Sequence, residues 1–213
     1  MDQEIKEGEQ MKDTRTLILL KPDGVKRGII GKIIERFEQK GLRLIGMKMT
    51  KATQEQLEEH YPDSMAEQIG EKAKKQFEAE GTAFPWDTEE YGMIIVKQLR
   101  EYIKKTPIIA AVFQGPHAPE AGRKVAGETE PREARPGTVR GDFHTESYEY
   151  ANKRNRPIRN LIHAADKENA EKEIKIWFNE DELYEEEYER AEEEIMRAPQ
   201  DGPKIEDLEK KNE

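Results

Sequence analysis

The 213 residues contain no cysteine, which excludes disulfides, thiolate metal sites and thiol nucleophiles. No apolar run approaches the about 18 residues of a membrane span, and the N-terminal residues MDQEIKEGEQ are acidic where a secretory signal would have an apolar core. Hydrophobic residues are scarce, at 34% against 38% charged residues. These absences predict a soluble, cytoplasmic protein without a membrane partner, long enough to bury one good core.

An excess of positive charge is also missing. The formal net charge is -10, and residues 180–213 alone hold 15 acidic and 5 basic residues, so the rest of the chain is formally neutral. This balance argues against a nucleic-acid partner, because surfaces that bind nucleic acid are basic. A neutral body still leaves room for a local basic pocket that holds a phosphorylated small molecule.

The two ends of the chain differ from its body. Residues 1–13 predict a flexible lead-in, and residues 181–213 predict an acidic tail that is helical as far as Pro199 and disordered after it. The apolar positions of the tail share one helical face: Tyr184, Tyr188, Ala191 and Ile195. A tail that only solvates the protein is the simpler interpretation of the same glutamates.

The chain begins with a β-α-β pattern. Thr16–Leu20 is a continuous apolar run that predicts a strand, and the KPDG sequence at residues 21–24 predicts a turn after it. Apolar residues recur at helical spacing over residues 25–37, and Gly41 is placed to end that helix. Leu42–Met49 predicts a strand buried on both sides. Its two faces are expected to be Leu42 with Leu44, and Ile45 with Met47.

A helical section separates the two halves of the chain. Residues 53–106 carry two apolar stripes at helical spacing, and the segment Gly81–Asp87 interrupts them, so we expect a helical hairpin. Ile108–Phe113 then predicts a third buried strand, and a helix is expected from near Pro119 to Ala126. Gly127–Gly141 predicts a long loop with basic side chains, of a length that is usually functional or disordered.

The last predicted strand and helix frame a histidine. Arg159–Ile162 predicts a brief strand, and residues 166–178 have the spacing of a buried helix face. His163 would therefore lie at a strand-to-helix corner, where a neutral imidazole near its ordinary pKa of about 6.5 is a competent nucleophile. Taken alone, a histidine at the boundary of an element is more often a capping or core residue than a nucleophile.

Cationic side chains from several elements are expected to gather around His163. They lie near the ends of apolar runs or in the long loop, and they are Lys21, Arg123, Arg140 and Arg135. Thr129 and Asn160 add neutral hydrogen-bond donors. Cations that offset charge, together with short polar groups that contact oxygens, form a set suited to binding a polyphosphate.

Four segments of the chain together resemble the nucleoside diphosphate kinase family. They are RTLILLKPDGVKRGIIGKIIERFEQKGLRLIGMKM, EHY, GETEPREARPGTVRGDF and NLIHAADKENAEKEI, in that family's order from Arg15 to Phe178. The longer sections at 61–107 and 143–160 resemble a long form of the family associated with archaea and some uncultured bacterial lineages. The resemblance implies an α/β (α+β) ferredoxin-like βαββαβ sandwich over residues 14–180, with an inserted helical hairpin at 61–106, a phosphate-binding loop at 127–141 and an acidic C-terminal helix.

The resemblance also implies a mechanism. The terminal phosphoryl group of ATP would pass to a nucleoside diphosphate in a ping-pong reaction through a phosphohistidine on His163, with Lys21 and Glu173 as further catalytic residues. The implied nucleotide-binding positions are Lys21, Tyr61, Ile95, Arg123, Thr129, Arg140 and Asn160. Mg²⁺ is the implied cofactor, held by nucleotide phosphates and water with no side-chain metal site. A homo-oligomer, hexamer or tetramer, is implied as well.

Two departures from the family's pattern affect these expectations. Ala165 stands where the family usually has serine, which removes a hydroxyl near the phosphohistidine and should cost no more than one hydrogen bond, about 0.5–1.5 kcal/mol. Ile95 falls where the family stacks a phenylalanine on the base, so either an apolar contact replaces the stack or a nearby aromatic residue supplies it. The candidates are Tyr91, Phe84 and Trp86. His60, His117 and His144 match no site position and are expected to be structural.

The expected activity is therefore a nucleoside diphosphate kinase of broad specificity. The alternative is a catalytically weak nucleotide-binding or scaffold member of the same family, which Ala165, the altered base position and the acidic tail motivate. DNA binding, reported for some relatives, is a third hypothesis that the neutral body and acidic tail oppose.

Overall fold

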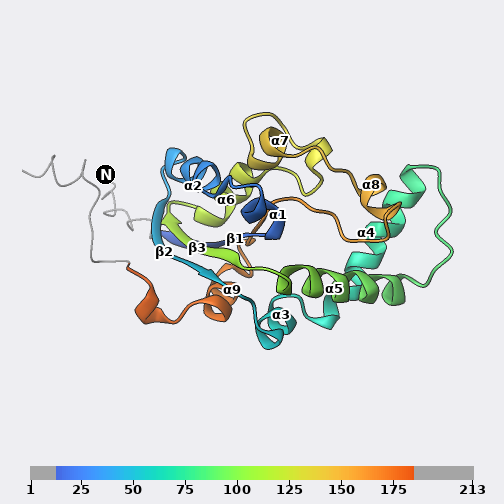
Figure 1. Ribbon diagram of the computed structural model, residues 1–213, viewed down its shortest axis with the longest axis horizontal. Coiled ribbons are helices and arrows are strands. Elements are labelled where there is room, and N and C mark those ends of the chain that lie inside the picture. The colour runs from blue at the N-terminus through green and yellow to red at the C-terminus, as the bar shows by residue number, and fades with distance from the viewer. Residues whose placement is uncertain (1–12, 185–213) are drawn as a thin grey trace, which may run out of the picture. The chain divides into compact units, whose positions relative to one another are not determined.

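The structure, a computed structural model, describes residues 13–184. Its four strands form one sheet in which all neighbours are antiparallel: β1 (Thr14–Leu20), β2 (Arg43–Thr50), β3 (Ile108–Gly115) and β4 (Ile162–Ala164). The spatial order is β2-β3-β1-β4. Figure 1 shows β2, β3 and β1 as neighbouring strands. This order confirms the predicted ferredoxin-like fold, in which β3 lies between the two strands that precede it in sequence. The predicted tail helix beyond Tyr184 lies outside the described residues.

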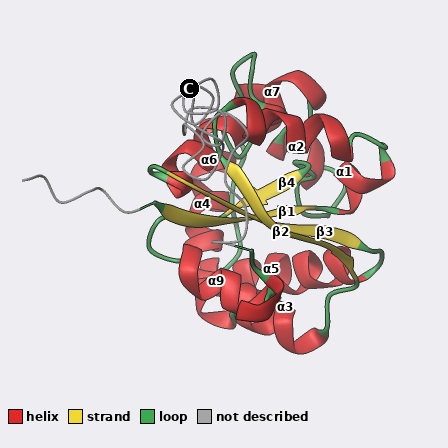
Figure 2. Cartoon of the chain, turned by 90° about the vertical axis from the view of Figure 1, so that its left-hand side faces the viewer, coloured by secondary structure: helices red, strands yellow, loops and turns green. Residues whose placement is uncertain are grey.

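Helices cover both faces of the sheet (Figure 2). One face carries α2 (Ile30–Gln39), α6 (Ala118–Ala126) and α7 (Val139–Phe143), and the other carries α3 (Gln54–His60), α5 (Thr88–Lys104) and α9 (Ala170–Trp177). Side chains alternate across a strand, so Leu17 and Leu19 of β1 enter the core on the α9 side and Ile18 enters the core on the α2 side. The continuous apolar run in β1 follows from this burial on both faces.

The helical hairpin is confirmed, and two glycines determine how closely its helices approach. α4 (Ala66–Ala79) packs on α5 after a short 3-10 turn at Asp63–Met65. A Cβ atom on Gly70 would lie 1.7 Å from the carbonyl oxygen of Thr88, and one on Gly92 would lie 1.8 Å from that of Ala66. The two backbones are therefore in contact, and any side chain at either glycine would force them apart.

The predicted turn after β1 is a short helix. α1 (Pro22–Lys26) has Pro22 at its first position, where the missing N–H costs nothing. Gly28 adopts φ +68°, which interrupts the helical conformation before α2, so the helix predicted from Val25 begins only at Ile30. The predicted end is confirmed: Gly41 adopts φ +87° just after α2.

A β-bulge in β2 moves Met47 to the opposite face from the one predicted. The register with β3 shifts between Leu44 and Gly46, so Met47 lies opposite Ala111 and not on the same face as Ile45. Met47 is 50% exposed and Met49 is 60% exposed, so the prediction that this strand is buried on both sides along its length is wrong. An extra residue in a strand moves every later side chain to the other face.

The segment before and around β4 also differs from the prediction. The predicted strand at 159–162 begins only at Ile162, because Leu161 has φ +67° and cannot be extended. α9 begins at Ala170 and not near residue 166. The predicted long loop contains a 3-10 turn at Pro131–Glu133 and the start of α7, and α8 (Tyr148–Asn152) was not predicted.

Among residues 13–184 no helix has both the length and the apolar character that a membrane crossing needs.

The contact between α4 and α5 leads to a stability prediction. Gly92→Ala places a methyl group where a carbonyl oxygen already lies, so we expect a loss of about 1–3 kcal/mol in the free energy of unfolding. Gly31→Ala is the matched control, because Gly31 is in α2 with no atom near its would-be Cβ and should gain up to about 1 kcal/mol from helix propensity. Urea denaturation of both variants measures the difference. Equal stability of the two variants would contradict the close contact.

Candidate active site

His163 lies at the centre of the three-residue strand β4. It pairs with Leu19 of β1, and its side chain points to the sheet face covered by α3 and α9. The side chain is 21% exposed, so the imidazole is held in place by its neighbours and still reaches solvent. The predicted strand-to-helix corner is therefore wrong in detail, since the strand continues for one residue beyond the histidine.

The KPDG segment holds the backbone that leads into His163. The N–H of Lys21 donates to the carbonyl of Leu161 at 2.7 Å, and the N–H of Leu161 donates to Asp23 Oδ2 at 2.9 Å. Gly24 lies so close that a Cβ there would be 2.9 Å from the Leu161 carbonyl oxygen. Leu161 is thereby kept in a left-handed conformation that costs a residue with a side chain roughly 1–2 kcal/mol.

Tyr102, on α5 of the hairpin, holds Asp23 in the position from which it binds Leu161. Its hydroxyl donates to Asp23 Oδ1 at 2.8 Å and accepts from the Asp23 backbone N–H at 2.9 Å. Burial, followed by the nearby Asp23 charge, raises the pKa of Tyr102, so the hydroxyl keeps its proton. The predictions from sequence did not include Asp23 or Tyr102 among the site residues, and the KPDG motif was the available signal for the former.

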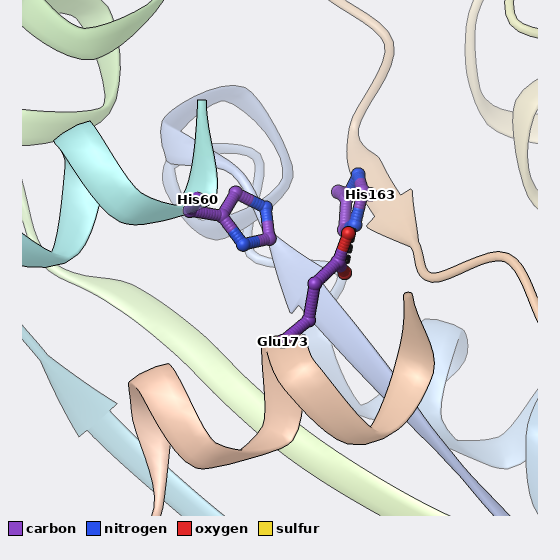
Figure 3. Close-up of side chains that lie close together, drawn as sticks. All are labelled: His60, His163 and Glu173. Atoms are coloured by element: carbon purple, nitrogen blue, oxygen red, sulfur yellow. Dashed lines mark hydrogen bonds and ion pairs between the residues drawn. The ribbon is translucent and has the colours of Figure 1, made fainter. Parts of the chain in front are cut away.

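Glu173 contacts the histidine directly. It lies on α9 with Ala170 and Ile174 on the inward-facing side of the helix, and its Oε2 is 2.6 Å from His163 Nε2 (Figure 3). Nδ1 of His163 makes no hydrogen bond with any of residues 13–184. Burial raises the pKa of Glu173 to about 7, and burial, with nearby cations second, lowers the pKa of His163. The histidine is therefore uncharged at neutral pH, with one nitrogen engaged and one available.

Cations surround this pair from several elements. Burial is the largest cause of the lowered pKa of His163. The next causes are the positive charges of Lys21, Arg140 and Arg123, in this order. Lys21 is buried, and its Nζ donates to Asn160 Oδ1 at 2.9 Å. Burial, then the charge of Arg140, lowers the pKa of Lys21 to about 8. Three of the four cations expected around His163, namely Lys21, Arg140 and Arg123, thus act on its pKa.

Arg140 and Asn160 also hold the backbone of the site. The guanidinium of Arg140 donates to three carbonyl oxygens, those of Gly127, Asn160 and Ile162, at 2.6, 3.1 and 2.8 Å. The Asn160 amide donates to the Thr129 carbonyl at 2.9 Å. Five N–H groups are present on a guanidinium, so Arg140 has donors left for a ligand.

The remaining predicted site residues occupy different surroundings. Arg123 and Thr129 are exposed, and Tyr61 is buried with a hydroxyl that has no hydrogen-bond partner among the described residues. Arg135 is 85% exposed and lies 3.8 Å from Glu128, and it is not among the charges that act on His163. Ala165 is buried in the core and pairs with Leu17 through its backbone.

Ile95 lies in a separate, aromatic pocket of about 480 Å³. The pocket is between α8 and the end of the hairpin where α4 connects to α5, and its walls include Trp86 and Tyr91, whose rings stack 5.2 Å apart. Phe84 packs edge-on against both rings. The three aromatic residues considered for base stacking are therefore one cluster, and Ile95 shares a pocket with two of them.

His60, expected to be structural, is in contact with the histidine pair. Its ring centroid is 4.6 Å from that of His163, and the ligand atoms of His60, His163 and Glu173 all lie within 4.8 Å of one another (Figure 3). Trp177 of α9 donates its indole N–H to His60 Nδ1 at 3.3 Å. The EHY segment was the only sequence signal that could have pointed to His60. His117 immediately precedes α6, and His144 lies beside Asp23 and Glu146.

Taken together, these groups can carry out nucleophilic attack on an anion. One imidazole nitrogen is free, the other is paired with a carboxylate, and lysine and arginine side chains supply positive charge in a largely buried site. Such a pre-organised set stabilises charge that develops on phosphoryl oxygens.

The chain is similar to proteins of known activity along most of its length. A family model described as nucleoside diphosphate kinase matches residues 14–183. The nucleoside diphosphate kinase of Pyrobaculum aerophilum is 40% identical over 179 residues, 80% of this chain and 98% of that protein. The crystal structure of an NDP kinase from Pyrobaculum aerophilum has a TM-score of 0.77 and 38% identity, over 81% of this chain and 100% of the other. The structure of a nucleoside-diphosphate kinase from Borrelia burgdorferi, described as a transition state mimic with bound vanadate and ADP, has a TM-score of 0.71 and 33% identity. The match covers 86% of this chain and 96% of the other.

The attachment of Leu161 can be tested by substitution of its partner. Asp23→Ala leaves the Leu161 N–H and the Tyr102 hydroxyl without their acceptor, so we expect a loss of about 1–3 kcal/mol in the free energy of unfolding. Asp23→Asn retains one oxygen of the same shape and should lose less. Urea denaturation compares the two variants with the native chain. If Asp23→Ala is as stable as the native chain, Asp23 does not hold this segment.

Proposed function

The chain belongs to the nucleoside diphosphate kinase family, and we propose that His163 is the residue that carries the phosphoryl group between its nucleotides. The protein is a transferase that moves phosphoryl groups between nucleotides, and its relatives favour this activity over a scaffold role. One observation supports His163 above all: its Nε2 is paired with Glu173 at 2.6 Å while Nδ1 has no partner among the described residues. An ionised Glu173 accepts a hydrogen bond from Nε2–H of His163, which fixes the proton on Nε2 and leaves the lone pair on Nδ1 for attack.

The proposed reaction has two half-reactions that balance. Nδ1 of His163 attacks the terminal phosphorus of a nucleoside triphosphate, an N–P bond forms, and the bond to the bridging oxygen breaks, so a nucleoside diphosphate leaves. A terminal phosphate oxygen of a second nucleoside diphosphate then attacks the same phosphorus, and the N–P bond breaks. Positive charge that develops on the imidazole is offset by the Glu173 carboxylate, which needs no proton transfer.

The phosphate oxygens of the nucleotide are proposed to bind to the side chains that surround His163. Lys21, Arg123 and Arg140 supply positive charge, and this proposal is supported by their common effect on His163. The unpartnered hydroxyl of Tyr61 and the exposed Thr129 provide further donors. Asn160, bonded to Lys21 and to the Thr129 carbonyl, orients the lysine. For the base we propose the region of Ile95, where an aromatic cluster lies in the same pocket.

Mg²⁺ is proposed to arrive as part of the nucleotide. Among the described residues, the single cluster of potential metal ligands has two imidazoles and one carboxylate, whereas Mg²⁺ prefers oxygen ligands. Both carboxylate oxygens of Asp23 already accept hydrogen bonds, from the Leu161 N–H and the Tyr102 hydroxyl. The lysine, arginine and amide groups of the site suit the nucleotide phosphates, whose oxygens would hold the metal ion.

A homo-oligomer, hexamer or tetramer, is proposed for the assembly. The half-exposed Met47 and Met49 support association of copies, because they place apolar side chains on an edge strand.

Labelling with ATP tests the role of His163. Incubation with ATP labelled on its terminal phosphate should give a phosphoprotein whose label is lost in acid and stable in base. His163→Ala should give no label and no detectable turnover, because the nucleophile is gone. His117→Asn, at the start of α6, is the control and should be labelled normally. Undiminished label on His163→Ala would place the phosphoryl group elsewhere.

The pKa shifts in the site lead to a prediction about pH. With ATP as substrate, kcat/KM should fall as the pH drops through about 7, because protonated Glu173 no longer accepts from His163. It should also fall as the pH rises through about 8, because Lys21 loses its charge. Glu173→Gln should remove the acid limb, and Lys21→Arg the alkaline limb. A flat profile between about pH 6 and pH 9 would show that neither group controls the reaction.

A further inference from the structure

His60 is a buried histidine whose ring faces the proposed nucleophile. It is the last residue of α3, is 5% exposed, and meets His163 at an interplanar angle of 77°. Figure 3 shows the side chains of His60 and Glu173 reaching toward His163 from two different helices. None of the steps of the proposed reaction uses His60, although it is as close to His163 as any aromatic residue of the site.

The hydrogen bond from Trp177 determines which nitrogen of His60 carries the proton. An indole N–H can only donate, so His60 Nδ1, 3.3 Å away, must accept with its lone pair. Burial is the largest cause that lowers the pKa of His60 to about 3, so the ring is neutral at ordinary pH. A neutral imidazole with a lone pair on Nδ1 has its proton on Nε2.

The Nε2–H of His60 is therefore a buried donor. It has no hydrogen-bond partner within the described part of the chain, which is costly and rare for a buried polar group. The same proton argues against a metal ion in this cluster: Nε2 of His60 has no free lone pair, and Nε2 of His163 is paired with Glu173. A buried donor beside a carboxylate suits a negative charge better than a cation.

We propose that His60 is a positioning residue for phosphoryl transfer, whose Nε2–H favours an ionised Glu173 and thereby a His163 with its lone pair on Nδ1. This inference rests on the proposed function. As the imidazole of His163 becomes positive during attack, the carboxylate must stay ionised in a buried site. A neutral N–H donor can stabilise that carboxylate and, unlike a cation, adds no charge that would oppose the positive charge developing on His163.

The other groups that face Glu173 are consistent with this role. Asp166, in the segment before α9, acts with burial to raise its pKa, while His60, Arg123 of α6 and Lys172 of its own helix act in the opposite direction. Of these three, His60 is the one in ring contact with His163. It is therefore placed to influence both members of the pair.

The test compares two substitutions at position 60. His60→Phe keeps an aromatic ring and removes both nitrogens, whereas His60→Gln can present an amide N–H near the position of Nε2. For His60→Phe we expect the acid limb of the kcat/KM profile to move to higher pH by about one unit. At a pH below the limb, kcat/KM should then be about tenfold lower than in the native enzyme, and at higher pH it should return to the native value. His60→Gln should restore most of the profile. In a Glu173→Gln background, His60→Phe should have no further effect on the profile.

Three outcomes would overturn the inference. They are a His60→Phe profile that coincides with that of the native enzyme, an equal loss in the Phe and Gln variants at every pH, and a full additional loss in the Glu173→Gln background. The second would indicate that His60 acts only by packing. These results are distinguishable from failure of the proposed function, because labelling of His163 in the native enzyme is measured independently. Absence of that label would refute the proposed function itself.

Discussion

The site depends on a short stretch of backbone, residues 160–162, that is held from both sides. Leu161 is bonded through both its N–H and its carbonyl to the residues just after β1, and Arg140 donates to the carbonyls of Asn160 and Ile162. Without these bonds Leu161 would not keep its left-handed conformation, and β4 would not begin where it does. The position of His163 follows directly from that starting point, because it is the second residue of the strand and pairs with Leu19 of β1.

The same burial that rigidifies the site creates an electrostatic conflict, and the arrangement of charges resolves it. Burial, and after it the charges of Lys21, Arg140 and Arg123, keep His163 uncharged, which a nucleophile needs. The same cations would repel the positive charge that appears on His163 during attack. Glu173 offsets that charge at 2.6 Å, yet burial works against its ionisation. Lys21 and Glu173 consequently both titrate closer to neutrality than such groups usually do, as is typical of functional sites.

Local patterns predicted the elements well where local forces decide them. The continuous run in β1, the break between α4 and α5, and Gly41 after α2 each carry their own physical cause, so they were confirmed. The prediction was wrong at β2, where a bulge moves Met47 to the other face, and before β4, where Leu161 leaves the extended region. Both features are set by bonds to distant strands and loops, which no window of neighbouring residues contains.

The amino-acid sequence by itself determined the fold class and the family, through segments whose residue types and order are specific in combination. It also supplied the types of side chain that a phosphoryl group requires. Tertiary structure alone decided which of them meet. The contact of His60 with His163, the direction of the Trp177 hydrogen bond, and the attachment of Leu161 by Asp23 and Tyr102 all join residues far apart in the chain. Such contacts depend on how helices and strands pack, and packing is a property of the whole core.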